Sequence, residues 1–218
     1  MARRFAVIGL GRLGSHLARS LAKRGAEVIA IDRDMRAVEA IKDQVTLAVR
    51  LDSVDEEALR AQGLDKVDAV IVAIGEDFES NVLTVALLKK LGVKQVIARA
   101  SSEIQQQILS LVGADKVFFP EADTAERLAQ LLISPSILDY IPLTDGRSVA
   151  QVNAPESFHG KTIAELKIRT RYGVNVIAVR RSGEKEITEM PSPDYVIKKG
   201  DVLVVVGANE DIEKLSKA

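Results

Sequence analysis

A glycine-rich loop with the sequence GLGRLG occupies residues 9–14, directly after the apolar run 5–8 and directly before an amphipathic segment. Asp32 lies eighteen residues beyond the last glycine of the loop and closes a second apolar run, 28–31. A glycine loop between a strand and a helix, with an acid about 20 residues further on, is the fingerprint of a dinucleotide-binding βαβ unit. This arrangement constrains the fold more than any other feature of the chain, and it predicts a nucleotide site.

Each glycine of the loop has a separate expected role. Gly9 allows the tight turn, Gly11 lets a phosphate approach the backbone, and Gly14 lets the helix pack close to the strand. Arg12 and Leu13 lie at the expected start of the helix, where exposed N–H groups attract anions. A glycine-rich turn without a ligand is the alternative, which the flanking strand, helix and acid disfavour.

The composition excludes several classes of protein. The 218 residues carry a net charge of −1, so nothing favours nucleic acid or an anionic membrane as the main partner. The chain has no cysteine, which rules out disulfides, thiolate metal sites and a cysteine nucleophile. The first residues show no signal-peptide pattern, and no apolar run approaches the roughly 18–20 residues of a membrane span. We therefore expect a cytoplasmic protein that reaches a membrane only through a partner.

Strand-like and helix-like patterns alternate through residues 1–119. Six apolar runs predict strands at 5–8, 28–31, 46–49, 69–73, 95–98 and 116–119. Between these runs, apolar residues recur at helical spacing. Runs such as 69–73 are apolar on both faces, as parallel strands covered by helices on both sides must be. We predict an α/β domain with a Rossmann-like, doubly wound parallel sheet.

The alternation ends after Phe119, and residues 120–144 are predicted as a helical crossover. Pro120 begins a long helix to about Ile133, and Ser134 begins a second short helix that ends near Tyr140. The segment is more apolar than a linker requires, through Leu128, Leu131, Leu132, Ile137, Leu138 and Ile141. We expect this hairpin to form a dimer contact with a second subunit. A hairpin folded over its own domain fits the periodicity equally well.

Residues 145–218 follow a different pattern, which predicts a second, smaller α+β domain. The expected strands are 149–152, 174–180, 186–188 and 201–206, and the expected helices are 161–167 and 210–217. No catalytic motif occurs in this part of the chain.

Residues at the ends of the predicted strands extend the nucleotide site. Asp32 is placed to bind a ribose diol and to repel a 2′-phosphate, although Arg33 beside it weakens that exclusion. Asp52, after the third strand, is a candidate contact for the adenine side, with a helix-capping acid as the alternative. The backbone must pass close to the ligand after the fourth strand, where the sequence reads Ala73, Ile74, Gly75.

Arg12 favours ATP or ADP as the ligand over a dinucleotide. A guanidinium in the glycine loop can reach a third phosphate, and ATP or ADP presents a more concentrated negative charge than NAD. Arg99, at the end of the fifth strand, adds a second cation at the same edge of the sheet. Both arginines are also consistent with ordinary surface charges.

Catalysis finds little support in the sequence. His16 and His159 have no serine, carboxylate pair or metal-spaced partner, and the GxxxxGK[ST] loop of ATP-hydrolysing proteins is absent. A nucleotide sensor therefore fits better than an enzyme. An NAD-dependent oxidoreductase is one alternative, and a free-standing ligand-binding protein that regulates some other partner is another.

Several motifs together resemble the RCK (KTN) domains of regulatory subunits in Trk/Ktr-type bacterial potassium transporters. They are GLGRLGSHLA at 9–18, IDRD at 31–34, VAIGED at 72–77 and GADKVFFPE at 113–121. The segment from VNVIAVRRSGE at 174–184 through KKGDVLVVVG at 198–207 is similar to the small C-terminal RCK lobe. The resemblance spans almost the whole chain.

This resemblance implies a ring of RCK dimers, expected to be an octamer, docked on the cytoplasmic face of a potassium-translocating membrane protein. ATP and ADP would hold different shapes of the ring. By the family pattern, the nucleotide site comprises Gly9, Gly11, Arg12, Leu13, Gly14, Asp32, Arg33, Asp52, Ala73, Ile74, Gly75 and Arg99.

The family pattern also implies further ligands. Glu121 matches a position that can hold Mg²⁺ or Ca²⁺ between subunits, and symmetry-related copies and phosphate oxygens would have to complete that site. A charge in the first turn of a helix is the alternative. Some relatives bind cyclic di-AMP in the second lobe, where Lys167, Arg169, Arg171 and Asn175 lie in a suitable segment. Other relatives bind NAD or NADH in the first lobe, so the cofactor assignment depends chiefly on Arg12.

Overall fold

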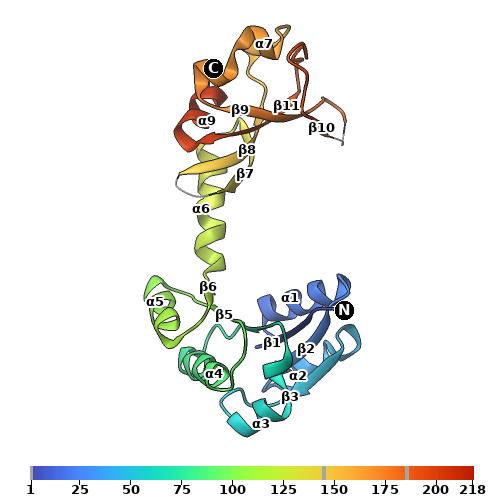
Figure 1. The fold of residues 1–218 in the computed structure, drawn as a ribbon, viewed down its shortest axis with the longest axis vertical. Helices are drawn as coiled ribbons and strands as arrows, with labels where there is room; N and C mark the ends of the chain where they lie inside the picture. Colours follow the sequence, from blue (N-terminus) through green and yellow to red (C-terminus); the bar gives the residue numbers. More distant parts are fainter. Residues whose placement is uncertain (1, 144–145, 185–186) are drawn as a thin grey trace. The chain divides into compact units, whose positions relative to one another are not determined.

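The protein consists of two compact units, Met1–Asp123 and Thr124–Ala218. The structure is a computed structural model that describes residues 2–143, 146–184 and 187–218. The two units have different architectures, which Figure 1 shows as a helix-flanked parallel sheet and a smaller, antiparallel β unit.

The first unit is built on six parallel strands in the order β3-β2-β1-β4-β5-β6. The strands are β1 (Arg4–Ile8), β2 (Glu27–Asp32), β3 (Leu47–Arg50), β4 (Ala69–Val72), β5 (Val96–Arg99) and β6 (Lys116–Phe118). The helices are α1 (Arg12–Lys23), α2 (Met35–Glu39), α3 (Glu56–Ala61), α4 (Phe78–Lys90) and α5 (Glu103–Val112), with 3-10 turns η1 (Lys42–Gln44) and η2 (Leu64–Lys66). The predicted doubly wound parallel sheet is confirmed.

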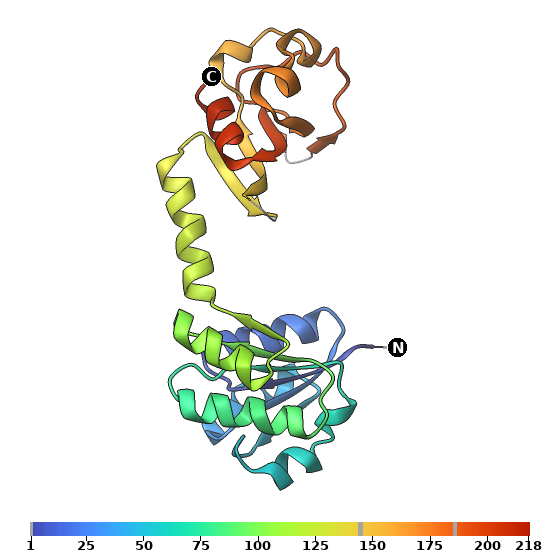
Figure 2. The same ribbon diagram turned by 60° about the vertical axis from the view of Figure 1, so that its left-hand side comes forward.

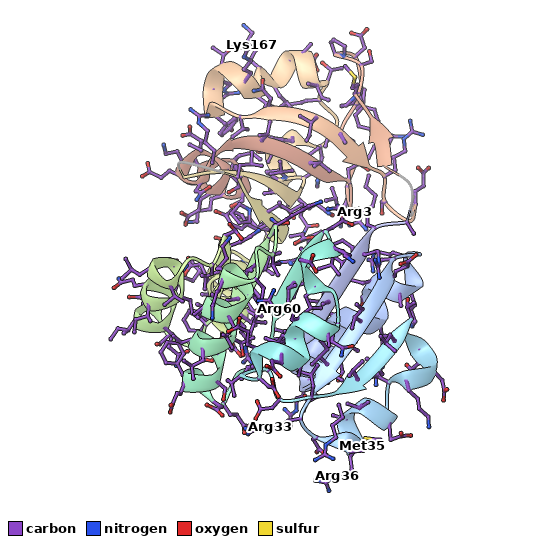
Figure 3. The ribbon with its side chains drawn as sticks, turned by 60° about the horizontal axis from the view of Figure 1, so that its bottom comes forward. Arg3, Arg33, Met35, Arg36, Arg60 and Lys167 are labelled. Atoms are coloured by element: carbon purple, nitrogen blue, oxygen red, sulfur yellow. The ribbon has the colours of Figure 1, made fainter. Side chains whose placement is uncertain are left out.

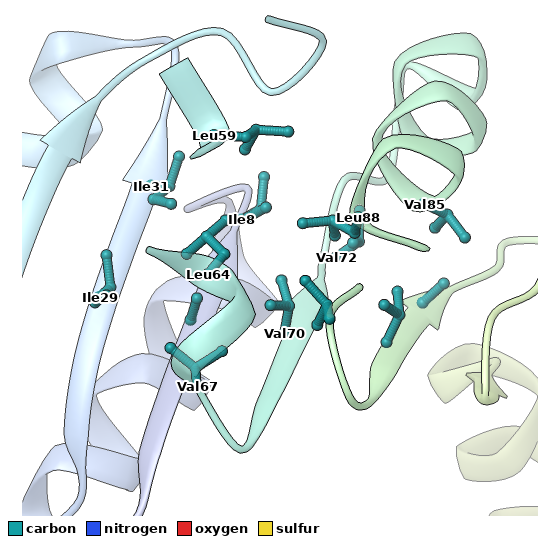
Figure 4. Close-up of a cluster of buried hydrophobic side chains, with 14 of the residues drawn as sticks. Ile8, Ile29, Ile31, Leu59, Leu64, Val67, Val70, Val72, Val85 and Leu88 are labelled. Carbon is teal, nitrogen blue, oxygen red and sulfur yellow. The ribbon is translucent and has the colours of Figure 1, made fainter. Parts of the chain in front are cut away.

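The sheet of the first unit is buried on both faces, because its strands are apolar at successive positions. Ala6 and Ile8 point into a core that α3, α4 and α5 cover. Leu88 of α4 belongs to the same core (Figure 4). Val7 points the other way, into a core closed by α1 and α2. Figure 2 shows α4 and α5 side by side on the face opposite α1. Each fully buried aliphatic side chain contributes about 1.5–3 kcal/mol to folding.

The strand order places a crevice between the carboxyl ends of β1 and β4. The order in which successive strands are added to the sheet reverses there, since β2 and β3 lie on one side of β1 while β4, β5 and β6 lie on the other. Connections leaving neighbouring strands at such a switch point diverge and leave room for a ligand. The glycine loop follows β1 at this place, and residues 73–75 follow β4.

One helix, α6 (Pro120–Ile133), follows β6, and the second helix predicted from Ser134 to Tyr140 is wrong. Residues Ile137–Pro142 form the strand β7, which pairs antiparallel with β8 (Arg147–Asn153). A register shift between Ile137 and Asp139 interrupts the inward-outward alternation of β7. The apolar residues therefore recur at a helix-like spacing although the backbone is extended.

The second unit is an antiparallel sheet with helices packed against it, as the α+β prediction requires. The strand order is β10-β9-β11-β8-β7, with β9 (Asn175–Arg180), β10 (Ile187–Glu189) and β11 (Val202–Ala208). The remaining elements are η3 (Glu156–Phe158), α7 (Ile163–Leu166), α8 (Ile168–Tyr172) and α9 (Asn209–Ser216). Because β7 belongs to this sheet, residues 137–142 are part of the second domain. The predicted boundary at 144/145 and the first residue of the predicted strand 186–188 lie outside the described residues.

The apolar residues of 120–144 divide into two groups. Ile137 is buried in the core of the second unit and so is not available to a partner subunit, and Leu131 packs partly buried against that core. The other large aliphatic residues described in this segment are exposed: Leu128 (53%), Leu132 (78%), Ile133 (71%), Leu138 (43%), Ile141 (56%) and Leu143 (52%). No helix in the described part of the chain is long and apolar enough to cross a membrane.

Candidate nucleotide-binding site

The glycine loop is packed so tightly that two of its glycines cannot be replaced without displacing backbone. Gly9 has a φ of +91°, and its N–H donates to the Ile31 carbonyl at 2.9 Å. A Cβ at Gly9 would lie 3.0 Å from the Ile74 nitrogen, and one at Gly14 would overlap the Gly9 carbonyl oxygen. The loop therefore closes against the end of β4 and against its own helix, as predicted for both glycines.

Gly11 differs from the other two glycines because its surroundings are open. A Cβ on Gly11 would meet no atom within 4 Å. It is the N-cap of α1 and offers no side-chain oxygen to the first turn of the helix. The first N–H groups of a helix have no partner within the helix, so this end of α1 is suited to an anion. We call the open surface over Gly11 the cradle, because it leaves room for an anion at this end of α1.

Arg12 and Leu13 are the first residues of α1. Arg12 is exposed, and no hydrogen bond or ion pair of its side chain occurs within the described residues. Leu13 is half-buried. Arg12 follows Gly11 directly in the first turn of α1, and its side chain is paired with no acid in the described part of the chain.

Asp32 connects the end of β2 to the glycine loop. Its carboxylate accepts from the Leu10 N–H at 2.6 Å and from the Asp34 N–H at 2.8 Å. The first contact fixes the backbone of the loop, and the second turns the chain after β2. The carboxylate thus lies beside the cradle, where the prediction of a ribose contact requires it.

Arg33 and Asp52 come together at the neighbouring strand ends. They line an open pocket of about 350 Å³ with Arg50 and Leu51. Arg50 Nε donates to the Arg33 carbonyl at 3.1 Å, a contact that sequence reasoning did not find. Asp55, rather than Asp52, accepts from the first turn as the N-cap of α3, so the helix-capping alternative for Asp52 is wrong. Figure 3 shows Arg33 projecting outward from the segment after β2.

Asp77 provides a link between Arg33 and α4. The carboxylate caps α4 by accepting from the Ser80 N–H at 3.0 Å and from its hydroxyl at 2.7 Å, and Arg33 Nη1 lies 3.3 Å away. The hydrogen bonds from Ser80, and then the charge of Arg33, hold the pKa of Asp77 below its usual range. This acid therefore remains ionised at neutral pH and forms an ion pair with Arg33 at the start of α4.

A buried asparagine that sequence reasoning missed fixes the ends of β4 and β5. Asn81 is 2% exposed, and its Nδ2 donates to the carbonyls of Ile74 and Arg99, both at 2.9 Å. The available signal was an amide on the inner face of α4, where Thr84 is a second buried polar residue beside Val85 and Leu88. The segment that follows β4 and the end of β5 are thereby held at a fixed separation.

Arg99 lies directly over Gly75. A Cβ on Gly75 would overlap Arg99 Nη1, so only glycine admits the guanidinium there. Arg99 Nη2 donates to the carboxylate of Glu121, in the first turn of α6. The arginine side chain is 21% exposed and the glutamate 55%. The structure therefore brings Ile74, Gly75 and Arg99 together as predicted, and adds Glu121 to them.

The described residues of one chain do not form a metal site. No group of three or more potential ligands with a suitable geometry occurs among them. Glu121 is paired with a cation, Arg99, rather than with other acids. A divalent ion at Glu121 would need ligands from outside this chain, as the sequence argument already required, and that assignment stays a prediction.

The two histidines and the basic residues of the second unit lie away from any such arrangement. His16 is exposed, and the His159 ring lies 3.3 Å from the Ala154 carbonyl. Lys167 joins α7 to α8 with a φ of +49°, and Figure 3 shows it at the surface. The residues proposed for cyclic di-AMP are all exposed: Lys167, Arg169, Arg171 and Asn175.

Fold and site together define a nucleotide-binding α/β domain joined to a small antiparallel β domain. Residues 5–120 match the TrkA-N domain model, and residues 148–218 match the TrkA-C domain model. The chain therefore belongs to the family of proteins built from TrkA-N and TrkA-C domains. The family inferred from the motifs is confirmed.

Individual relatives agree with this assignment. The chain is 38% identical over 217 residues to Ktr system potassium uptake protein C of Bacillus subtilis (strain 168), covering 100% of this chain and 97% of the relative. Among solved structures, the GsuK RCK domain matches with a TM-score of 0.56 and 26% identity, covering 99% of this chain and 46% of that one. The GsuK channel bound to NAD matches with a TM-score of 0.55 and 26% identity, covering 99% and 38%.

The chain spans less than half of these two structures. The curated relative is named as a potassium uptake protein and not as an enzyme. The expectation that this protein is not an enzyme agrees with that name.

Proposed function

We propose that this chain is the nucleotide-sensing regulatory subunit of a potassium-uptake system. In this proposal, ATP or ADP binds at the glycine loop and controls K⁺ flux through a membrane partner of Trk/Ktr type. The observation that carries the proposal is the cradle over Gly11, bordered by Asp32 and by the unpaired end of α1. The name of the Bacillus subtilis relative supplies the link to potassium uptake.

The residues of the crevice fit a nucleotide in chemistry as well as in shape. The N-terminus of α1 offers N–H donors to phosphate, and Asp32 offers a carboxylate to a ribose diol. Arg12 would contact the terminal phosphate, because its side chain starts at the first turn of α1. Arg33 and Asp52 would border the base through the pocket at the ends of β2 and β3.

Control of a membrane partner follows from differential binding. A ligand shifts an equilibrium between two conformations only by as much as its affinities for them differ. We propose that ATP and ADP stabilise different arrangements of a ring of these subunits. The subunits would form homodimers through the exposed residues of α6 and β7, assemble into an octamer, and lie in the cytoplasm at the inner face of the membrane.

A second candidate function is NAD(H) sensing, which the GsuK channel bound to NAD favours. The same cradle and the same acid suit the pyrophosphate and ribose of a dinucleotide. Arg12 distinguishes the two proposals, because the terminal phosphate of ATP or ADP carries more negative charge than either phosphate of a dinucleotide and would gain more from the guanidinium.

The exposed cluster Lys167, Arg169, Arg171 and Asn175 is the candidate for cyclic di-AMP in the second unit. Three basic side chains beside a strand are equally typical of a solvated edge, so this ligand stays a prediction that direct titration with the dinucleotide tests.

Calorimetric titration of nucleotide-stripped protein with ATP, ADP, NAD and NADH tests the proposal. We expect ATP or ADP to bind more tightly than either dinucleotide. In the Arg12→Ala variant the affinity for ATP should fall about tenfold or more, as for a lost charge-assisted hydrogen bond, with a smaller change for ADP.

Lys23→Ala is the matched control, since it removes the same charge from the last turn of the same helix. An unchanged ratio of ATP to ADP affinity in Arg12→Ala would remove the terminal-phosphate role of Arg12. A clear preference for NADH would support the second candidate, and failure to bind any of the four would refute both.

A further inference from the structure

We propose that Arg99 is shared between Glu121 and the phosphates of the nucleotide, so that an anion in the crevice competes with the ion pair at the start of α6. The inference rests on the proposed nucleotide binding and adds a route by which occupancy of the crevice reaches α6. The contacts that support it are those of Gly75, Asn81, Arg99 and Glu121.

The backbone of Arg99 is fixed by a hydrogen bond, while its guanidinium can exchange one anionic partner for another. Asn81 donates to the Arg99 carbonyl and to the Ile74 carbonyl, so the ends of β5 and β4 are held together. The guanidinium lies against Gly75, directly after the strand that borders the crevice. An arginine fixed at its base and lying against the residue that follows β4 can turn toward an anion bound at the end of that strand.

The guanidinium is not satisfied by its contact with Glu121. Nη2 donates to the glutamate, whereas Nε is buried and has no hydrogen-bond partner among the described residues. A guanidinium carries five N–H donors in a fixed plane and matches phosphate oxygens as well as carboxylate oxygens. A phosphate in the crevice would therefore offer the guanidinium the same kind of contact that Glu121 offers, and the two acceptors would compete for it.

The ion pair is of the kind that exchanges readily. Glu121 is 55% exposed, and water screens partly exposed pairs. A phosphate group carries more negative charge than a single carboxylate, so it is the stronger competitor for Arg99 when it is bound in the crevice.

Loss of the pair has a consequence for α6. Glu121 lies in the first turn of this helix, which begins at Pro120 and continues into the second unit. Its contact with Arg99 connects that first turn to the end of β5. When the nucleotide takes Arg99, this connection is lost, and the start of α6 becomes more mobile. Ligand occupancy is thereby transmitted to the helix that leads out of the nucleotide-binding unit.

The test is titration of the full chain with ATP and with adenosine, in EDTA, for wild type, Glu121→Gln, Arg99→Gln and the double variant. Glu121→Gln removes the competitor and should tighten ATP about twofold to fivefold, while adenosine binding stays unchanged. Arg99→Gln should weaken ATP about tenfold. The double variant should match Arg99→Gln, because the glutamate has no effect without the arginine.

Glu27→Gln is the matched control. This glutamate pairs with Arg4, is exposed to a similar degree at 49%, and lies at the amino end of β2, the opposite edge of the sheet. Backbone hydrogen exchange of residues 121–126 provides a second readout. Exchange should rise when ATP is added to wild type, and it should already be raised in Glu121→Gln without ATP.

The outcomes separate this inference from the proposed function. ATP binding to wild type with unaltered affinity in Glu121→Gln would refute the inference alone. The inference would also be refuted if the effects of Glu121→Gln and Arg99→Gln on ATP affinity were additive in the double variant, or if Glu27→Gln raised ATP affinity as much as Glu121→Gln does. Failure of wild type to bind ATP would refute the inference together with the ATP-sensing proposal.

Discussion

Replacement of Gly14 by alanine is expected to destabilise the first unit, because the added methyl would overlap the Gly9 carbonyl oxygen. Inserting a methyl group into a closely packed contact typically costs about 1–3 kcal/mol. Alanine in a helix recovers about 0.5–1 kcal/mol relative to glycine. The net loss is about 1–2 kcal/mol, and with a typical urea dependence the unfolding midpoint should fall by about 1 M.

Gly11→Ala is the matched control for this prediction. Its φ of −62° suits alanine, and the methyl would meet no atom within 4 Å. The loss of a favourable N-cap residue and the lower entropy of the unfolded chain roughly cancel, so stability should change by no more than about 0.5 kcal/mol. The methyl would instead occupy the phosphate cradle, so nucleotide affinity should fall while the fold is retained.

Urea denaturation followed by far-UV circular dichroism measures both variants. All three tyrosines, Tyr140, Tyr172 and Tyr195, lie in the second unit, so their fluorescence reports on that unit separately. The tyrosine transition should be the same in wild type and in both variants. Equal stability of Gly14→Ala and Gly11→Ala would contradict the packing argument for the loop.

Two further predictions concern acid stability and assembly. Asp115 accepts from the Val96 N–H at 2.7 Å and from Lys89 at 3.0 Å, and these contacts, the backbone one first, lower its pKa. A lowered carboxyl pKa stabilises the fold above the unfolded value of about 3.9, and this contribution is lost as the pH falls through the folded value. Asp115→Asn should therefore unfold at a lower urea concentration than wild type at pH 6. The difference between the two urea midpoints should narrow below about pH 4. A difference that does not change with pH would contradict this role of the Asp115 carboxylate. Leu132→Glu, at a side chain 78% exposed on α6, should lower the assembly state measured by light scattering while the thermal unfolding midpoint is kept, and an unchanged mass would remove α6 from the interface.

Most of the first unit could be predicted from local patterns. The glycine loop, the two-sided apolar strands and Asp32 each express a requirement that neighbouring residues impose, so the parallel sheet and the crevice follow from them. Strand ends were displaced by a residue or two, as at β2 and β3, because hydrogen bonding to the adjacent strand decides where pairing stops.

The second half of the crossover could not be predicted in the same way. Residues 137–142 have apolar positions that suit an amphipathic helix, and Ser134 with Pro135 resembles a helix start. Pairing with β8, which includes a register shift, makes this segment a strand instead of a helix. That pairing depends on residues outside the segment. Burial of Ile137 follows from that pairing.

The sequence by itself determined that the chain carries a glycine loop after its first strand, an acid at the end of its second strand and a doubly wound sheet, because each depends on local spacing and patterning. The tertiary structure alone decided that Asn81 ties β4 to β5, that Arg50 borders the Arg33 pocket and that Glu121 meets Arg99 over Gly75. These contacts join residues on different strands and helices. Their side chains meet only because parallel strands bring their carboxyl ends to one edge of the sheet, and no local pattern in the sequence records that meeting.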